Sequence, residues 1–305
     1  MLNPKLAELI SRVNETEDKT IFFLGGMIKS GTTWVERIFD VHPNVVCKGE
    51  AHFGSLLEPA LSEAVANYNA VIPKKGNWNR HSESGIEPLP ATTYSYLTFD
   101  VDFMLRQSML LMLQKWVTSG DIRCVGEKTP NNTRYFGKLA YLFPNARFVY
   151  VIRDIRDIIV SGWFFNMAVN PGKTQPAHNR IEDYALPMIQ RWENDVSEGL
   201  TFIDNAGKNG TFVRYEDIIE NPRREIAGLY EFLGVDCSEP LVSQCASLTA
   251  FKSLSGGREH GEENRSSFYR KGVVGDWENH LSSTIVDQVA TECGPLMEWL
   301  GYELN

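Results

Sequence analysis

An apolar segment, a glycine-containing loop and an amphipathic segment follow one another near the start of the chain, and this succession constrains the fold most. Ile21–Gly26 is short, apolar and ends in glycines, which is typical of a buried parallel strand. Thr32–Val41 has helical spacing, with Trp34 and Ile38 among the apolar residues that can share one side. The succession therefore predicts a strand, a loop and a helix of an α/β domain.

Further apolar runs alternate with helical patterns along the 305 residues. Arg147–Ile152 is the clearest strand, and Ile122–Gly126 and Thr211–Val213 are shorter ones. This alternation predicts an α/β fold with a central, mostly parallel sheet flanked by helices, whose ligands lie at the carboxyl ends of the strands. The other predicted helices are Leu6–Val13, Phe103–Trp116, Thr133–Phe143, Asp154–Met167, Ile181–Ala206, Pro222–Leu233 with Asn221 as N-cap, and Ser283–Leu300.

The composition narrows the classes of partner and compartment. A formal net charge of −9 argues against a general binder of nucleic acid or anionic membranes, so positive charge that binds an anion must be local. The five cysteines include no C-x-x-C pair, which argues against a zinc site or a disulfide framework. Met1–Thr20 has no apolar signal core, and no run approaches the roughly 18 apolar residues of a spanning helix. We therefore expect a soluble, cytoplasmic protein.

The loop from Gly26 to Thr33 has the G-x-x-x-x-G spacing of a P-loop, in which backbone N–H groups and the next helix cradle phosphate oxygens. In a nucleotide-hydrolysing P-loop the following residue is Lys, but here Thr32 holds that position and Lys29 lies inside the loop. Lys29 is therefore expected beside a single phosphate and the group bonded to it. The spacing alone fits an ordinary glycine turn equally well, but the flanking strand and helix favour phosphate binding.

Two other basic clusters could bind a second anion. Arg153 is the first polar residue after the clearest strand, and Ser161 follows about two turns into the next helix, so both can reach one phosphate. Arg270, Lys271 and Gly272 follow a glycine-rich, charged segment and could close over a ligand. Taken alone, each cluster is more typical of a solvated, salt-bridged surface.

Together, these motifs resemble those of sulfotransferases that use 3′-phosphoadenosine 5′-phosphosulfate (PAPS). Lys29–Trp34 (KSGTTW) resembles the family's 5′-phosphosulfate loop. Tyr150–Ser161 resembles its 3′-phosphate strand and helix, and Arg270–Trp277 (RKGVVGDW) resembles its C-terminal RKGxxGDW segment. The YED…NP…FLG stretch that begins at Tyr215, and the T-x-F of Thr249 and Phe251, also match.

The resemblance implies a cofactor site with two ends and an adenine wall between them. It implies that the 5′-phosphosulfate of PAPS is held by Lys29, Ser30, Gly31, Thr32 and Thr33. It implies that the 3′-phosphate is held by Arg153, Ser161, Arg270, Lys271 and Gly272, and that Trp34, Tyr215, Thr249 and Phe251 surround adenine. The product would be adenosine 3′,5′-bisphosphate (PAP), and no metal is required.

In many cytosolic members of the family the general base is the His of a Lys-Thr-His triplet. This sequence has no such triplet, so its general base must be another residue. The segment around Glu50 resembles the Glu-containing segment of glycan and tyrosyl-protein sulfotransferases, and Glu127-Lys128-Thr129-Pro130 resembles the EKTP of the glycan group. Glu50 is therefore the first candidate for the base, and His52 and Glu127 are alternatives. Lys128 is expected to bind the transferring group or to orient Glu50. A surface carboxylate at a helix end is the competing interpretation of Glu50.

The resemblance implies one sulfotransferase domain over residues 1–305, with loops on the acceptor side at about 54–100, 170–180 and 253–268. The expected acceptor is a small molecule or sugar that offers a hydroxyl or an amine. The sequence fixes neither the acceptor group nor the oligomeric state.

Two other functions compete with sulfuryl transfer. A P-loop kinase is disfavoured by Thr32 and Arg153, and a non-catalytic PAPS-binding module by the pairing of Lys29 with a candidate base.

Overall fold

The computed structural model describes residues 3–71, 95–169 and 180–304. Within these ranges five strands form one parallel sheet in the order β2-β3-β1-β4-β5. Because the strands run in one direction, their carboxyl ends meet at one edge, which is where α/β sheets bind ligands. The strands are β1 (Thr20–Gly26), β2 (Val45–Gly49), β3 (Cys124–Lys128), β4 (Arg147–Ile152) and β5 (Gly210–Arg214).

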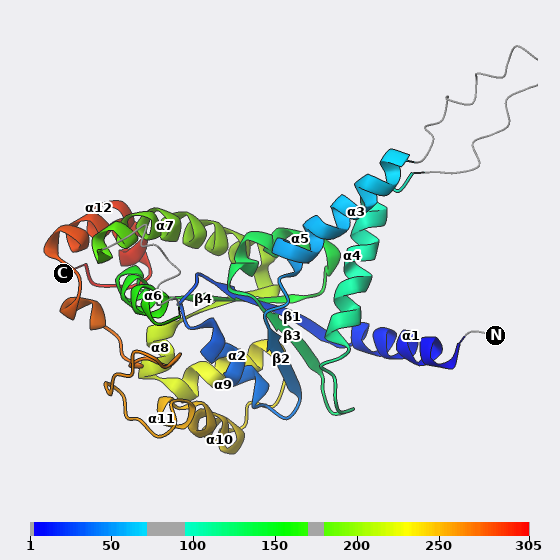
Figure 1. Cartoon of the computed structure of the whole chain (residues 1–305). Helices are drawn as coiled ribbons and strands as arrows, with labels where there is room; N and C mark the ends of the chain where they lie inside the picture. Colours follow the sequence, from blue (N-terminus) through cyan, green and yellow to red (C-terminus); the bar gives the residue numbers. More distant parts are fainter. Residues whose placement is uncertain (1–2, 72–94, 170–179, 305) are drawn as a thin grey trace, which may run out of the picture.

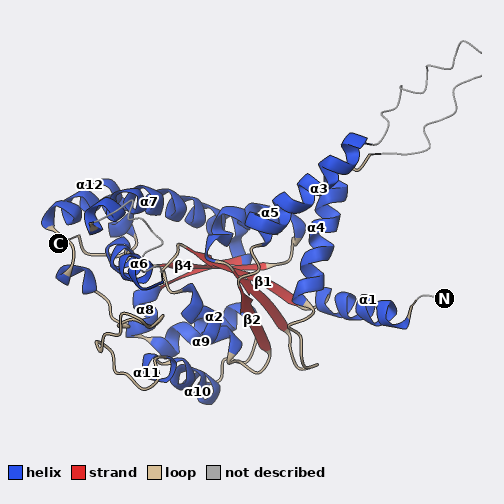
Figure 2. Cartoon of the chain, in the orientation of Figure 1, coloured by secondary structure: helices blue, strands red, loops and turns tan. Residues whose placement is uncertain are grey.

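Helices cover both faces of the sheet (Figures 1 and 2). On one face the core includes side chains of α2 (Thr32–Asp40), α8 (Tyr215–Glu220), α9 (Pro222–Leu233) and α10 (Glu239–Thr249). On the other face it includes side chains of α1 (Pro4–Glu17), α4 (Thr98–Leu113), α5 (Phe136–Leu142), α6 (Ile155–Val169), α7 (Ile181–Ala206) and α12 (Ser283–Trp299). The remaining helices are α3 (Glu58–Val71), α11 (Phe251–Leu254), the π-helix η1 (Phe53–Leu57), and the 3-10 helices η3 (Pro130–Tyr135), η4 (Gly207–Asn209) and η5 (Asp276–Asn279).

The central strands are buried on both faces, as their continuous apolar sequences predict. Successive side chains alternate between the two cores: Phe23 and Phe148 join the core under α7, whereas Phe22 and Val149 join the core under α2. This double burial fixes the register of β1 and β4, whose partners include Phe23 with Phe148. The sheet is therefore a rigid platform for the loops at its carboxyl edge.

The predicted α/β class and parallel sheet are confirmed, and several elements match closely. The bounds of β4, α7 and α9 are those expected. Pro222 opens α9 and Gly234, at φ 66°, follows its end, but the Asn221 side chain makes no capping hydrogen bond.

The expected loop at 54–100 is wrong for much of its described part. α3 covers 58–71 and α4 begins at Thr98, and the two helices lie side by side and extend away from the sheet (Figure 1). The sequence of α3 contains Glu, Leu and Ala, which are good helix formers. Residues 72–94, and residues 170–179 of the second expected loop, lie outside the described residues. In the third expected loop, residues 255–268 have no regular secondary structure.

Candidate active site

The loop between β1 and α2 has the backbone shape of an anion cradle. Lys29 and Gly31 have φ of 70° and 97°, and Gly31 is the N-cap of α2. A Cβ at Gly31 would lie 2.5 Å from the ring of Tyr215, so only glycine fits there. The hydroxyl of Ser30 is buried without a hydrogen-bond partner. A buried hydroxyl that has no partner and lies next to the N-terminus of a helix is suited to donating a hydrogen bond to an anion.

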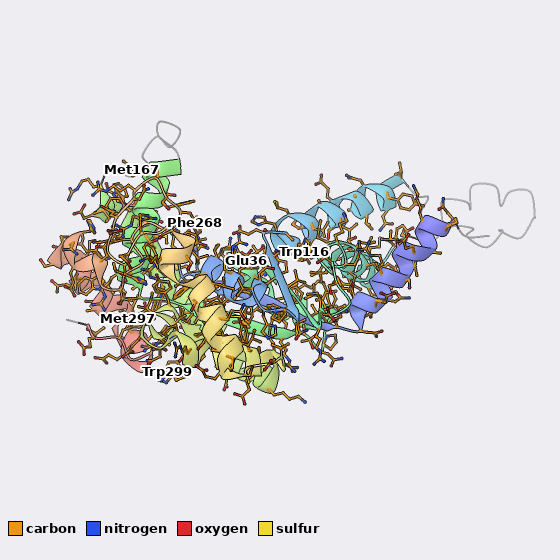
Figure 3. The ribbon with its side chains drawn as sticks, turned by 90° about the horizontal axis from the view of Figure 1, so that it is seen from below. Glu36, Trp116, Met167, Phe268, Met297 and Trp299 are labelled. Carbon is orange, nitrogen blue, oxygen red and sulfur yellow. The ribbon has the colours of Figure 1, made fainter. Side chains whose placement is uncertain are left out.

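The ammonium of Lys29 lies between two aromatic rings. Its Nζ is 4.0 Å from the ring centroid of Phe165 on α6. It is 4.7 Å from the ring centroid of Phe268, which Figure 3 labels and which belongs to residues 255–277, here called the C-terminal segment. Among the described residues, no carboxylate forms an ion pair with Lys29. Burial, with the charges of Arg153 and Arg270, lowers the pKa of Lys29 to about 8. The cation therefore gains from any anion that enters.

Arg153 lies at the carboxyl end of β4, as predicted. Its guanidinium donates to the carbonyls of Lys29 (3.4 Å) and Val273 (3.2 Å), and lies 4.1 Å from the ring centroid of Tyr215. Its Nε is buried without a hydrogen-bond partner. The side chain thus joins the loop after β1 to the C-terminal segment, while one of its N–H groups is left for a ligand.

Two buried carboxylates fix the C-terminal segment against α6. Asp157 accepts hydrogen bonds from the backbone N–H groups of Gly275 (3.0 Å) and Trp277 (3.2 Å). Asp276 accepts one from Lys271 (2.5 Å) and a shorter one from Arg270. Although burial acts in the opposite direction, these two cations lower the pKa of Asp276 to about 2. Arg270 and Lys271 are therefore held in place rather than solvated.

The expected adenine residues form one wall. The indole of Trp34 donates to the carbonyl of Thr249 (2.8 Å), and its ring packs edge-on against Tyr215 with 5.4 Å between centroids. Gly272 has φ of 66°, and a Cβ there would lie 2.2 Å from the ring of Phe251. The backbone at Gly272 therefore packs directly on Phe251, and the two residues line the cavity together.

A cavity of about 320 Å³ connects the loop, Arg153, the C-terminal segment and Glu50. Among the residues predicted for the site, it is lined by Lys29, Gly31, Thr32, Thr33, Trp34, Glu50, Arg153, Ser161, Tyr215, Phe251, Arg270, Lys271 and Gly272. The predicted residues that do not line it are Ser30, His52, Glu127, Lys128 and Thr249. Residues from all three motifs therefore meet around one space, although the motifs lie far apart in the sequence.

A buried lysine organises the carboxylates at one end of this cavity. The Nζ of Lys128 is 2.8 Å from Glu50 Oε1, 3.2 Å from Glu36 Oε2 and 3.3 Å from Thr33 Oγ1. Burial lowers the pKa of Lys128, but the carboxylates of Glu50 and Glu36 outweigh burial and raise that pKa above its usual value. Lys128 thus stays charged and holds Glu50 toward the loop.

The other two candidate bases have different surroundings. Glu127 is fully buried, and its carboxylate accepts hydrogen bonds from Ala51 N (2.9 Å), Thr129 Oγ1 (2.6 Å) and Asn132 Nδ2 (2.7 Å). Burial raises the pKa of Glu127 despite these bonds. All of its contacts go to protein, so it supports the loop after β2.

His52 contacts Glu50 but does not line the cavity. Its Nε2 lies 3.5 Å from Glu50 Oε2 and its Nδ1 lies 3.3 Å from Ser55 Oγ. Of the three candidates, Glu50 alone lines the cavity.

Sequence reasoning missed four residues of this region. Glu36, labelled in Figure 3, looks like an ordinary polar residue of an amphipathic helix, yet it is buried on α2. Its carboxylate lies 3.2 Å from Lys128 Nζ. Phe165, Phe268 and Tyr269 line the cavity, and the rings of Phe165 and Phe268 contact Lys29. Phe268 and Tyr269 directly precede the predicted Arg270, and this position next to the motif was the one available signal.

The donors of the cavity fit a nucleotide that carries anionic groups at two ends. The Nε of Arg153, which lines the cavity, has no hydrogen-bond partner, and neither has the buried hydroxyl of Ser30 in the adjoining loop. Lys29, Arg153, Arg270 and Lys271 supply cations around the same cavity. The described residues contain no group of three His, Cys, Asp or Glu that could hold a metal ion.

Comparison with known proteins decides the family. A model described as "Sulfotransferase family" matches residues 22–239. The chain belongs to the sulfotransferase family. Cytosolic sulfotransferase 10 of Arabidopsis thaliana is 30% identical over 47% of this chain and 47% of its own length. The chain thus spans about half the length of the relatives that it matches first.

Solved structures confirm the sulfotransferase fold. The mouse sulfotransferase SULT7A1, complexed with PAP, superposes with a TM-score of 0.55 and 16% identity over 92% of this chain and 87% of its own. The sulfotransferase domain from the curacin biosynthetic pathway gives 0.53 and 18% over 94% and 99%. The family recognised from the three motifs is therefore confirmed. Among the described helices, none combines the length and apolarity that crossing a membrane requires.

Proposed function

We propose that this sulfotransferase transfers a sulfuryl group from PAPS to a hydroxyl group of a small-molecule or sugar acceptor, with Glu50 as general base. The observation that carries the proposal is the single cavity that joins the Lys29 loop, the cations Arg153 and Arg270, and Glu50. A donor with two anionic ends and an acceptor that loses a proton need all of these groups in one place.

PAPS supplies the sulfuryl group, and its 5′-phosphate is the leaving group. The N–H groups at the start of α2 and the side chains of Thr32 and Thr33 hold the phosphosulfate. The Lys29 ammonium neutralises the charge that grows on the bridging oxygen as the bond to sulfur breaks. Arg153, Ser161 and Arg270 hold the 3′-phosphate.

The acceptor side depends on Glu50 and Lys128. Glu50 takes the proton of the acceptor hydroxyl as that oxygen forms its bond to sulfur, so the products are a sulfate ester, PAP and a protonated carboxyl group. The Lys128 ammonium, 2.8 Å from Glu50, fixes the carboxylate on the cavity side. Phe165 and Phe268 narrow the cavity beside Lys29 and exclude water from the reacting groups.

We expect kcat/KM for PAPS to fall above pH of about 8. The pKa of Lys29 in the free protein is lowered to about 8 by burial and by Arg153 and Arg270, so the ammonium is lost as the pH rises through that value. Bound phosphosulfate opposes this loss, so the descending limb of kcat should lie at higher pH than the limb of kcat/KM. Initial rates from pH 6 to 10 test both limbs; coincident limbs would contradict the role of Lys29.

Incubation of the protein with sulfur-labelled PAPS and a panel of phenols, alcohols, amines and sugars tests the function. We expect labelled ester with at least one hydroxyl acceptor and stoichiometric release of PAP. Binding of PAP without transfer to any acceptor would instead support a non-catalytic module. Magnesium-dependent phosphorylation from ATP would support a kinase.

A further inference from the structure

The guanidinium of Arg258 lies at the centre of the segment that precedes the anion-binding residues. One of its terminal nitrogens donates to the carbonyls of Glu262 and Arg270, both at 2.8 Å. The other donates to the hydroxyl of Ser267 (3.0 Å) and to the carbonyl of Tyr269. The side chain thus binds three carbonyl oxygens and one hydroxyl oxygen of residues 262–270, a stretch without regular secondary structure.

The next two carbonyls are also bound by this segment. The backbone N–H of Gly261 donates to the carbonyl of Lys271 (3.0 Å), and Nδ1 of His260 donates to the carbonyl of Gly272 (2.5 Å). With the bond from Arg258 to Arg270, three successive carbonyl oxygens are satisfied. Because carbonyl oxygens repel an anion, binding them to this segment leaves the cationic side chains to meet the ligand.

Arg258 does this without lining the cavity itself. Its guanidinium lies 5.3 Å from the ring centroid of Phe251, which does line the cavity on the adenine side. One side chain therefore contacts the residue expected beside the base and holds the backbone of Arg270. A shift of this guanidinium would displace the cations of Arg270 and Lys271 relative to that base.

We propose that Arg258 is a positioning residue for the anion site of Arg270 and Lys271, and that it holds their backbone so that both cations meet the 3′-phosphate of the nucleotide. This inference rests on the proposed nucleotide site. It predicts that a change at Arg258 weakens the binding of nucleotides with a 3′-phosphate and spares nucleotides without one. Only the former gain affinity from correctly placed Arg270 and Lys271.

The test compares two nucleotides in calorimetric binding to the full chain: PAP, and adenosine 5′-monophosphate, which lacks the 3′-phosphate. Arg258→Ala and Arg258→Lys are expected to weaken PAP by about 10- to 100-fold, the scale of one or two charged hydrogen bonds. Both should change the binding of adenosine 5′-monophosphate by less than about threefold. Lysine keeps the charge but cannot bind four acceptors as the planar guanidinium does.

Arg223→Ala is the control for the loss of an arginine. Arg223 lies on α9, is exposed and pairs with Glu239 (3.7 Å), whereas Arg270 pairs with Glu263 and Asp276. The control substitution should leave the ratio of the two affinities unchanged. If Arg258→Ala does not fold, Arg258→Lys carries the comparison.

Three outcomes would overturn the inference. Full PAP affinity in Arg258→Lys would mean that only the charge matters. If the wild-type chain prefers PAP and the Arg258 variants keep the same ratio of the two affinities, with or without an equal loss for both nucleotides, Arg258 does not position the anion site. A wild-type chain with no preference for PAP would remove the proposed function together with the inference.

Discussion

Replacing Lys29 with methionine is expected to lower kcat by about 100- to 1,000-fold, the cost of removing one preorganised donor to a developing negative charge. Methionine keeps the apolar stem between Phe165 and Phe268, so the packing of that stem is retained. PAP lacks the sulfuryl group and the charge that grows in the transition state, so its affinity should fall by less than about tenfold. Single-turnover rates at saturating PAPS and calorimetric titration with PAP measure the two effects.

Lys48→Met controls for the loss of a lysine. Lys48 lies at the end of β2, is partly exposed and pairs with Asp40 (2.5 Å). Its replacement should change kcat by less than about twofold, because exposed ion pairs contribute little. An undiminished kcat in Lys29→Met would remove Lys29 from the reacting centre, and an equal loss of kcat and PAP affinity would limit its role to nucleotide binding.

The sequence predicts well those parts of the fold that depend on continuous apolar runs. β4 has an apolar run of five residues, which fits a strand buried on both faces, and its bounds were predicted without error. β2 was missed because it contributes only Val45, Val46 and Cys47 before Lys48 and Gly49. So short a run is not distinguishable from a loop until its partner β3 is known.

The loop and the cations that line the cavity were predictable because these residues lie in contiguous motifs. The local geometry at Lys29 and Gly31 follows from the glycine and from the strand and helix on either side. Glu36 was not predictable, because its ionic partner Lys128 is brought to it by the pairing of β3 with β1. Contacts of this kind depend on tertiary structure, and no local sequence pattern predicts them.

The same limit applies to the choice among the candidate bases. Glu127 and Glu50 both lie in recognisable motifs, and nothing local distinguishes a buried carboxylate from an accessible one. In the structure Glu127 is fully buried, whereas 37% of the Glu50 side chain is exposed. Exposure thus favours Glu50, the candidate that the motifs already placed first, over Glu127.

Replacing Glu50 with glutamine is expected to lower kcat by about 100- to 10,000-fold, the usual contribution of a general base. Glutamine keeps the size of the side chain and can still accept a hydrogen bond from Lys128, so PAP affinity should stay within about threefold of wild type. The expected signature is therefore a lost chemical step with intact nucleotide binding. Quenched-flow measurement of product formation, alongside PAP titration, separates the two.

The alternative bases provide the discriminating comparison. His52→Asn should lower kcat by less than about tenfold, because His52 meets Glu50 at 3.5 Å and does not line the cavity. Glu127→Gln should chiefly lower thermal stability, since it places an amide where the N–H of Ala51 and two side chains donate. If Glu127→Gln or His52→Asn instead abolishes turnover in a folded protein while Glu50→Gln remains active, the base is not Glu50. The Lys128 ammonium would then have to serve the transferring group rather than the carboxylate beside it.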